Sequence, residues 1–443
     1  TPMRYIPHTD EDRKEMLSKI GVKSIEDLFE DIPKNLKQRN ELNIPEALDE
    51  YSILKTLNTI SEQNQSLNKL INFLGAGVYE HYIPSTVLPL ITRGEFLTAY
   101  TPYQPELSQG YLQTIYEFQS LVCEITKMDV ANASMYDGAT ASAEAVIMSS
   151  QIKNKSKAIV EKSVHPHYLE CIKTFAGSAG CEITECEYDE IKNHLDDSVA
   201  CVVLQYPDFY GRIKNLSAFR KQTQEKDIHL IIISEPIALG VFKTPGEYGA
   251  DCVVGEMQPC GIPMGYGGPM AGYFTVKKEM IRSIPGRIVG RTKDAEGRRG
   301  FTMTLRTREQ DIRREKATSN ICTNQALMAL ASTVWLCALG KNGFRQLAET
   351  CVKKAHYTAK LLTKIPNVKL QFPSDPFAFE FTLNINTNAN KIQDKLLDAG
   401  ILAGLPLGNY NAELENCLLL CVTEVRTKDE IDKLALELAK VVN

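Results

Sequence analysis

Residues 229–235 read His-Leu-Ile-Ile-Ile-Ser-Glu, a short apolar run of β-forming residues that ends at a carboxylate. With helical stretches between them, similar runs occur at 157–160, 201–205, 251–254 and 271–274. Three of the runs are apolar almost throughout, which is typical of strands covered on both faces. The pattern predicts an α/β fold with a mainly parallel sheet and helices on both sides. Ligands in such sheets bind beyond the carboxyl ends of the strands.

The chain has 443 residues, which is too long for one compact core, since cores stop growing near ~250–300 residues. Residues 1–70 predict an N-terminal arm of amphipathic helices, the first of which Asp10 can cap. Residues 71–330 predict the large α/β domain. Residues 331–443 predict a small α+β domain that ends in a helix at 429–442. The half-exposed strands expected in this small domain are 366–370 and 378–381.

The composition excludes several classes of protein. Hydrophobic residues make up 43% and charged residues 24%, which is ordinary for a soluble globular protein. No stretch approaches the ~18 apolar residues that a membrane span needs. The net charge is −5, so a nucleic-acid-binding surface is not expected. The twelve cysteines form no C-x-x-C pair, which predicts reduced core thiols and, without a signal pattern at the N-terminus, a cytoplasmic location.

A junction between a loop and a helix at 137–145 predicts a seat for an anion. The small residues Gly138 and Ala139 let backbone amides approach a ligand, and a helix N-terminus favours negative charge. Thr140 adds a hydroxyl donor. A well-capped helix with a packing face of small residues explains the same pattern equally well.

Two versatile side chains follow strands of the predicted sheet. His165 follows the strand at 157–160, where it can stack on an aromatic ligand, transfer a proton or be structural. Glu235 follows the strand at 229–234, where a buried carboxylate is costly unless it has a partner such as a cationic ring nitrogen. A solvated or ion-paired loop carboxylate is the alternative. Because the seven histidines do not cluster with carboxylates at ligand spacing, no metal site is predicted.

Two further segments stand out. The segment 255–269 is dense in Gly and Pro, follows the strand at 251–254 and lacks the G-x-G-x-x-G pattern of dinucleotide sites. The segment 277–316 holds thirteen Lys/Arg and six Asp/Glu, a balance of +7, which leaves −12 for the rest of the chain. Arg298 and Arg299 lie near its centre. A solvated face is the simple explanation, but so many arginines favour an anion site, an acidic partner or a subunit contact.

The order of these features resembles pyridoxal-phosphate enzymes of the aspartate-aminotransferase type, that is, fold type I. In that family the histidine stacks on the cofactor ring, the carboxylate pairs with the pyridine nitrogen, and a lysine forms the Schiff base. By motif register the place of the lysine falls at Gln258, and an amide cannot form an imine. Glu235 stands where the family usually has Asp. The nearby lysines that lie off this register are Lys243, Lys277 and Lys278.

Longer runs resemble one family more closely, the glycine cleavage system P-protein, and within it the α subunit of the two-chain form. The resemblance covers about residues 1–443, and the replacement by Gln258 is part of it. The runs that carry it are 73–84, 100–110, 132–140, 305–310 and 318–325.

The resemblance implies a role in glycine decarboxylation. A partner β subunit would hold the pyridoxal phosphate, and the aminomethyl group left from glycine would pass to the lipoyl arm of the H-protein. An α2β2 assembly is implied. The pocket in this chain would be vestigial, formed by Gly138, Ala139, Thr140, His165, Glu235 and Gln258. The candidates for contact with the partner's site or with another protein are Tyr100, Tyr103, Gln104, Glu106, Gly265, Gly267, Gly268, Arg298 and Arg299.

Two other hypotheses remain open from the sequence. The chain could be an autonomous pyridoxal-phosphate enzyme that uses an off-register lysine such as Lys243, against which Gln258 argues. It could also be a non-catalytic scaffold, in which Thr140, His165 and Glu235 would be packing relics.

Overall fold

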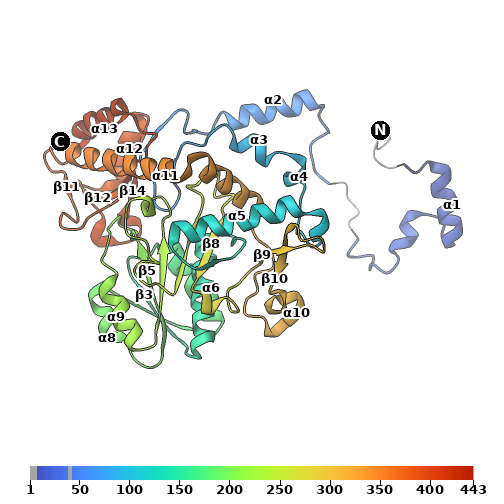
Figure 1. The fold of residues 1–443 in the computed structure, drawn as a ribbon. Helices are drawn as coiled ribbons and strands as arrows, with labels where there is room; N and C mark the ends of the chain where they lie inside the picture. The colour runs from blue at the N-terminus through green and yellow to red at the C-terminus, as the bar shows by residue number, and fades with distance from the viewer. Residues whose placement is uncertain (1–6, 38–41, 443) are drawn as a thin grey trace. The chain divides into compact units, whose positions relative to one another are not determined.

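The structure is a computed structural model that describes residues 7–37 and 42–442 and divides the chain into two units, one on each side of the Gln65–Ser66 bond (Figure 1). The first unit contains α1 (Asp10–Ile20), the 3-10 helix η1 (Ile25–Phe29) and α2 (Glu50–Ser61), none of which has a buried residue. Thr9 caps α1, because its hydroxyl accepts the N–H of Asp12 while the Asp12 carboxylate accepts the N–H of Thr9. The prediction that Asp10 caps this helix is therefore wrong: the reciprocal capping box needs its acid three residues after the cap.

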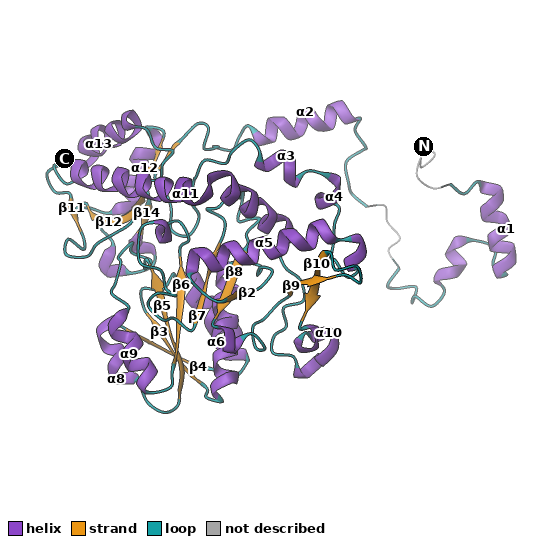
Figure 2. Cartoon of the chain, in the orientation of Figure 1, coloured by secondary structure: helices purple, strands orange, loops and turns teal. Residues whose placement is uncertain are grey.

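The second unit is built on a seven-stranded sheet with the strand order β2-β8-β7-β6-β5-β3-β4 (Figure 2). The neighbours from β4 to β7 pair in parallel, whereas β8 runs antiparallel to both β7 and β2. The mainly parallel sheet predicted from the apolar runs is confirmed. Its strands are β2 (Val130–Ala131), β3 (Lys157–Glu161), β4 (Glu182–Cys186), β5 (Val199–Tyr206), β6 (His229–Ser234), β7 (Cys252–Glu256) and β8 (Gly272–Val276).

Alternate side chains of the central strands enter two separate hydrophobic cores. In β6, Leu230 and Ile232 pack into the core that includes residues of α5 (Gln109–Thr126) and α11 (Ala326–Leu362). Ile231 and Ile233 point to the other face, into the core of α6 (Gly138–Lys153) and α7 (Pro166–Ser178). Burying each such side chain stabilises the fold by about 1.5–3 kcal/mol. Helices thus cover both faces, which is why the strand is apolar at each position from Leu230 to Ile233.

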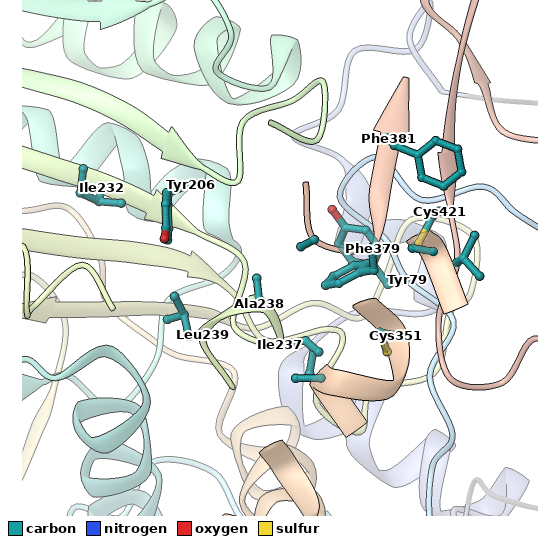
Figure 3. Packing of buried hydrophobic residues seen from close by; sticks show 14 of the residues in the cluster. Tyr79, Tyr206, Ile232, Ile237, Ala238, Leu239, Cys351, Phe379, Phe381 and Cys421 are labelled. Atoms are coloured by element: carbon teal, nitrogen blue, oxygen red, sulfur yellow. The ribbon is translucent and has the colours of Figure 1, made fainter. Parts of the chain in front are cut away.

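A four-stranded antiparallel sheet with the order β11-β12-β15-β14 lies in the C-terminal part. The segment 378–381 was expected to be half-exposed, but Ala378, Phe379 and Phe381 are buried. The expectation is wrong because β12 lies between two strands, and because Phe379, just before it, and Phe381, within it, join the core that includes residues of α11. There the ring of Phe379 meets that of Tyr79 edge-on (Figure 3). The elements are β11 (Lys369–Leu370), β12 (Glu380–Asn384), β14 (Leu405–Pro406), β15 (Cys417–Cys421), α12 (Ala389–Asp398) and α13 (Lys428–Val442).

The structure joins the two parts of the chain that the sequence separates at residue 330. Helix α11 runs through this position and kinks further on at Gly340, whose φ of 62° and ψ of 179° suit only glycine. Strand β1 (Ile71–Asn72) pairs in parallel with β13 (Ile401–Leu402). Residues 66–443 form one compact unit by their contacts, and the domain boundary at 330 stays a prediction.

The basic segment 277–316 folds around a hairpin of β9 (Ile288–Lys293) and β10 (Arg299–Thr304). Among the residues that the structure describes, no helix has the length and apolar character needed to cross a membrane. The remaining helices are α3 (Val87–Ile91), α4 (Gly94–Leu97), α8 (Ile191–His194), α9 (Ser217–Glu225), α10 (Gln310–Arg313), η2 (Pro105–Leu107), η3 (Tyr188–Glu190), η4 (Ala238–Gly240), η5 (Lys278–Met280), η6 (Arg306–Arg308), η7 (Arg314–Lys316), η8 (Leu407–Asn409) and η9 (Ala412–Leu414).

Candidate functional site

A small cavity of about 40 Å³ lies where β5, β6 and β7 end. Two of the predicted site residues, His165 and Glu235, line it, and Gln258 is buried next to the lining residue Pro259. A cavity of this size holds only a few water molecules. Its full lining is Gly77, Tyr79, His165, Tyr168, Gln205, Ile233, Ser234, Glu235, Pro236, Gly255, Glu256 and Pro259.

The predicted anion seat at the N-terminus of α6 is occupied by the protein's own carboxylates. Asp137 caps the helix, its Oδ1 accepting the N–H of Thr140 at 2.7 Å and the Thr140 hydroxyl at 2.8 Å. The Oε2 atom of Glu256 accepts the N–H of Gly138 at 3.0 Å. Ala139 lies in the same first turn. Two amides of this first turn, those of Gly138 and Thr140, are therefore already paired with carboxyl groups, as in the well-capped helix that the sequence left open.

Glu256 was missed as a site residue. Its Oε1 accepts the N–H groups of Gln258 at 3.0 Å and Ala271 at 2.8 Å. Burial raises the pKa of Glu256 to about 7, although three backbone N–H groups oppose this rise. The signal that would have found it is the one that singled out Glu235, a carboxylate at the end of a buried strand.

Gln258 uses its whole amide to hold the backbone of two other segments. The N–H of Tyr79 donates to Oε1 at 2.8 Å, and Nε2 donates to the carbonyl oxygens of Tyr79 at 3.0 Å and Ile262 at 2.9 Å. The side chain is buried. Gln258 thereby fastens the segment around Tyr79 across the end of β7.

His165 is held as a neutral imidazole. Its Nδ1 accepts the N–H of His167 at 3.1 Å, and its Nε2 donates to the carbonyl oxygen of Ala76 at 3.0 Å. Burial lowers the pKa of His165 to about 4. A Cβ atom on Gly77 would lie 3.4 Å from Nε2, so the backbone at 76–77 packs directly against the ring.

Glu235 and Glu380 are both half-buried acids that bond to nearby groups of the chain. Glu235 accepts the N–H groups of Ile237 at 2.9 Å and Ala238 at 2.7 Å, and burial raises its pKa to about 8. Glu380 accepts the N–H of Ala76 and the hydroxyl of Tyr79, both at 2.7 Å, and burial raises its pKa to about 7. No feature of the sequence connects Glu380 to this site, because it comes from β12 of the other sheet.

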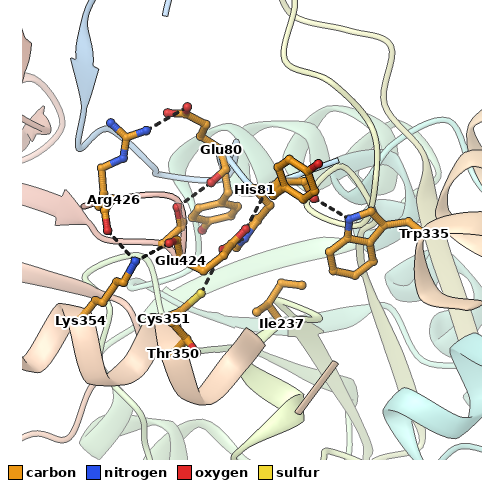
Figure 4. A network of polar contacts seen from close by, with 12 residues as sticks. Glu80, His81, Ile237, Trp335, Thr350, Cys351, Lys354, Glu424 and Arg426 are labelled. Atoms are coloured by element: carbon orange, nitrogen blue, oxygen red, sulfur yellow. Dashed lines mark hydrogen bonds and ion pairs between the residues drawn. The ribbon is translucent and has the colours of Figure 1, made fainter. Parts of the chain in front are cut away.

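A second network of hydrogen bonds holds the segment that follows Tyr79, at His81 and Tyr82, to the C-terminal part of the chain (Figure 4). Glu424 lies at its centre, where Oε2 is 2.7 Å from Nδ1 of His81 and accepts the thiol of Cys351 at 3.3 Å. Its Oε1 accepts the N–H of Tyr82 at 2.7 Å, and the indole of Trp335 donates to the carbonyl oxygen of Tyr82 at 2.9 Å. Residues far apart in the chain form this group, so sequence spacing could not show it. The potential ligand atoms of His81, Cys351 and Glu424 lie within 4.8 Å of one another. The 2.7 Å between Nδ1 of His81 and Oε2 of Glu424 is, however, the distance of a hydrogen bond.

The remaining candidates lie away from the cavity. Tyr103 is half-exposed, and the guanidinium carbons of Arg306 and Arg287 lie 5.5 and 5.8 Å from the centre of its ring. The 100–110 loop is thereby joined to the basic segment. Arg298 pairs with Asp294, and Arg299 lies over Phe301. The other exposed or partly exposed candidates are Tyr100, Gln104, Glu106, Gly265, Gly267 and Gly268.

Pyridoxal phosphate, the cofactor implied for this fold by the resemblance, does not fit the residues present. Asp137 and Glu256 occupy the amides that its phosphate would need. No Lys or Arg is among the described residues that line the cavity. Its volume of about 40 Å³ is far below the ~300–1,000 Å³ of typical ligand sites.

The off-register lysines are directed elsewhere. The ammonium of Lys243 lies 4.4 Å from the ring centre of Tyr248. Lys277 pairs with Asp251, and Lys278 is exposed in η5. The geometry therefore gives no support to an autonomous enzyme built on one of them.

Comparison with known proteins identifies the family. The family model described as glycine cleavage system P-protein matches residues 3–438. A relative from Geobacillus thermodenitrificans, named probable glycine dehydrogenase (decarboxylating) subunit 1, is 49% identical over 442 residues that cover 98% of both chains. A relative of the same name from Desulforamulus reducens is 46% identical and covers 99% of this chain and 100% of its own.

Solved structures agree with these relatives. A crystal structure of glycine decarboxylase (P-protein) of the glycine cleavage system, in inhibitor-bound form, is 39% identical, with a TM-score of 0.90, and covers 99% of this chain and 100% of its own. A sphingosine-1-phosphate lyase from Burkholderia pseudomallei, 14% identical with a TM-score of 0.66, covers 90% of this chain and 92% of its own and shares the fold alone. The predicted fold type I is confirmed, and the chain belongs to the glycine cleavage system P-protein family, beside members named glycine dehydrogenase (decarboxylating) subunit 1.

Proposed function

We propose that this chain is the lysine-less α subunit of a glycine decarboxylase and acts with a β subunit that holds the pyridoxal phosphate. The observation that carries the proposal is the hydrogen bonding of Gln258. Its amide binds the backbone of Tyr79 and Ile262 at the position that motif register assigns to the family's lysine. A side chain used in this way closes the pocket and leaves no nucleophile for an imine.

The role of the chain is then to shape the partner's site. The exposed 100–110 loop and the loop at 261–268 are our choice for this contact, with Tyr103 as its best-supported residue because two arginines flank its ring. The substrate is glycine, and the acceptor of the aminomethyl group is the lipoyl arm of the H-protein. We expect an α2β2 assembly in the cytoplasm.

The test compares the purified chain, the β subunit and their mixture. Each is incubated with pyridoxal phosphate, reduced with borohydride and mapped by peptide mass spectrometry, and CO2 release from glycine is measured with H-protein. The expected result is a stoichiometric adduct on the β subunit alone and full CO2 release only from the mixture. A stoichiometric adduct on this chain, or full activity of the β subunit without it, would overturn the proposal.

The β subunit and the H-protein are the two candidate partners of the basic segment, and one charge-reversed variant distinguishes between them. Reversing the charge at the exposed Arg298 and Arg299 tests whether the hairpin meets the β subunit or the acidic H-protein. Loss of αβ assembly indicates the first, whereas a raised KM for H-protein with intact assembly indicates the second. Reversing the charges of the exposed Lys360 and Lys364, outside the basic segment, is the control matched for net charge.

A further inference from the structure

We propose that a second cavity, in the basic segment, binds the phosphate group of a small molecule. The cavity measures about 320 Å³ and is lined by Arg282, Leu305, Thr307, Arg308 and Arg313. It shares no lining residue with the cavity at the end of β5, β6 and β7. Neither the family's chemistry nor the proposed role of Gln258 requires it.

The charge of this cavity is strongly positive. Three guanidinium groups and one hydroxyl line it, and no carboxylate does. In the described part of the chain, Arg282, Arg308 and Arg313 form no ion pair, whereas Arg298 and Arg306 in the same segment pair with Asp294 and Asp311. The acid next in the chain, Glu309, is half-buried, and burial raises its pKa. Glu309 attracts Arg308 electrostatically, but among the described residues none of the three arginines has the paired carboxylate that Arg298 and Arg306 have.

Arg308 gives the strongest reason to expect a ligand. It is only 6% exposed, and Nη1 donates to the carbonyl oxygen of Ile284. Its Nε and Nη2 are buried and find no acceptor among the described residues. A buried guanidinium with unpaired N–H groups is unfavourable, and an oxyanion entering from the cavity supplies the missing acceptors.

The arrangement fits phosphate better than an isolated carboxylate. The guanidinium fork binds two oxygens of either group, but three guanidinium groups without ion pairs to described residues suit the phosphate, because a phosphate monoester carries about two negative charges and three acceptor oxygens. Arg282, Thr307 and Arg313 are exposed, while Arg308 is buried, so the site has an open mouth and one buried donor. The volume exceeds that of inorganic phosphate, so a phosphate monoester fits as well as the free ion.

The test uses the full chain and isothermal titration calorimetry in chloride buffer at constant ionic strength. The probes are inorganic phosphate and glycerol phosphate, with glycerol as the control without phosphate. We expect both phosphates to bind and glycerol not to. Tighter binding of glycerol phosphate indicates a monoester as the ligand, and equal binding indicates free phosphate. Failure of both to bind would overturn the proposal.

Matched variants separate a specific site from general attraction to a basic segment. Arg308→Gln should weaken phosphate binding by at least about tenfold, the loss expected for a charge-assisted hydrogen bond. Arg291→Gln removes the same charge from an exposed position of β9 outside the cavity and should leave binding unchanged. Equal weakening by both variants would show diffuse attraction and refute the site. If Arg308→Gln does not fold, Arg313→Gln at the exposed mouth serves in its place.

Discussion

Gln258 and Tyr79, which are 179 positions apart, pair through two hydrogen bonds between one side-chain amide and one peptide backbone. The N–H of Tyr79 donates to Oε1 and its carbonyl oxygen accepts from Nε2, as in a rung between two strands. An amide presents a donor nitrogen and an acceptor oxygen side by side, which a lysine ammonium cannot do. The pairing therefore links the residue type at position 258 to the closure of the pocket.

A lysine placed at position 258 should not create a cofactor site. In Gln258→Lys the N–H of Tyr79 loses its acceptor and an ammonium is buried, so we expect the free energy of unfolding to fall by about 1–3 kcal/mol. No stoichiometric pyridoxal phosphate adduct should form, because Asp137 and Glu256 still occupy the phosphate amides. Denaturant unfolding and borohydride mapping measure the two effects. Gln151→Lys, on the exposed side of α6, is the control, and a stoichiometric adduct at position 258 in a stable protein would contradict this account.

The contribution of Glu380 to the stability of the chain should fall as the pH rises from about 5 to 7. Burial raises the pKa of Glu380 from its usual 4.5 to about 7, so the unfolded chain releases this proton before the folded one does. The stabilisation is complete below pH 4.5 and is lost as the pH rises through 7, by roughly 1.4 kcal/mol per pH unit between these values. Glu380→Gln keeps an acceptor for Ala76 and a partner for Tyr79, so it should remove the share of this carboxyl from the slope between pH 4.5 and 7.

The measurement is denaturant unfolding at a series of pH values. Glu225→Gln, at the exposed end of α9, should keep the slope of the parent chain. A slope unchanged by Glu380→Gln would mean that this carboxyl is ionised in the folded protein.

Glu424 should contribute strongly to stability at neutral pH. Burial alone raises the pKa of Glu424, but the hydrogen bond with His81 and the N–H of Tyr82 hold it below its usual value. The carboxylate stabilises the fold above pH 4.5, and this contribution is lost as the pH falls through the lowered pKa. Glu424→Gln should lower the free energy of unfolding at pH 7 by about 1–3 kcal/mol, measured in urea. Glu413→Gln, at an exposed position, should change it by less than about 0.5 kcal/mol, and an equal effect of both would remove Glu424 from this role.

Tyr103 should affect activity more than folding. Its ring is 53% exposed, and the guanidinium carbons of Arg306 and Arg287 lie 5.5 and 5.8 Å from its centre, so Tyr103→Ala should cost the chain less than about 1 kcal/mol. CO2 release by the reconstituted complex should fall by at least about tenfold, since contacts buried against a partner carry more energy than exposed ones. The control is Tyr357→Ala, which removes a tyrosine that is 42% exposed on α11. Full activity of the Tyr103 variant would exclude the loop from the partner's site.

The elements with a strong local signal were predictable. The apolar runs predicted β3, β5, β6 and β7 because a strand buried on both faces must be apolar at nearly every position. The place of His165 and Glu235 after strands also followed, because strand ends set where the next residues lie. The cap of α1 and the exposure of β12 were predicted wrongly, since one depends on a reciprocal contact and the other on neighbouring strands.

The sequence by itself determined the fold class, the family and the absence of a lysine at position 258, because these depend on local pattern and residue type. Only the tertiary structure decided what the side chain at position 258 binds. Glu256, Glu380 and the backbone of Tyr79 come from three distant segments, and their meeting around Gln258 and the start of α6 follows from how the segments pack. Burial then decides the charge state of Glu256 and Glu380, because a carboxyl group that leaves water without a cation beside it keeps its proton to a higher pH.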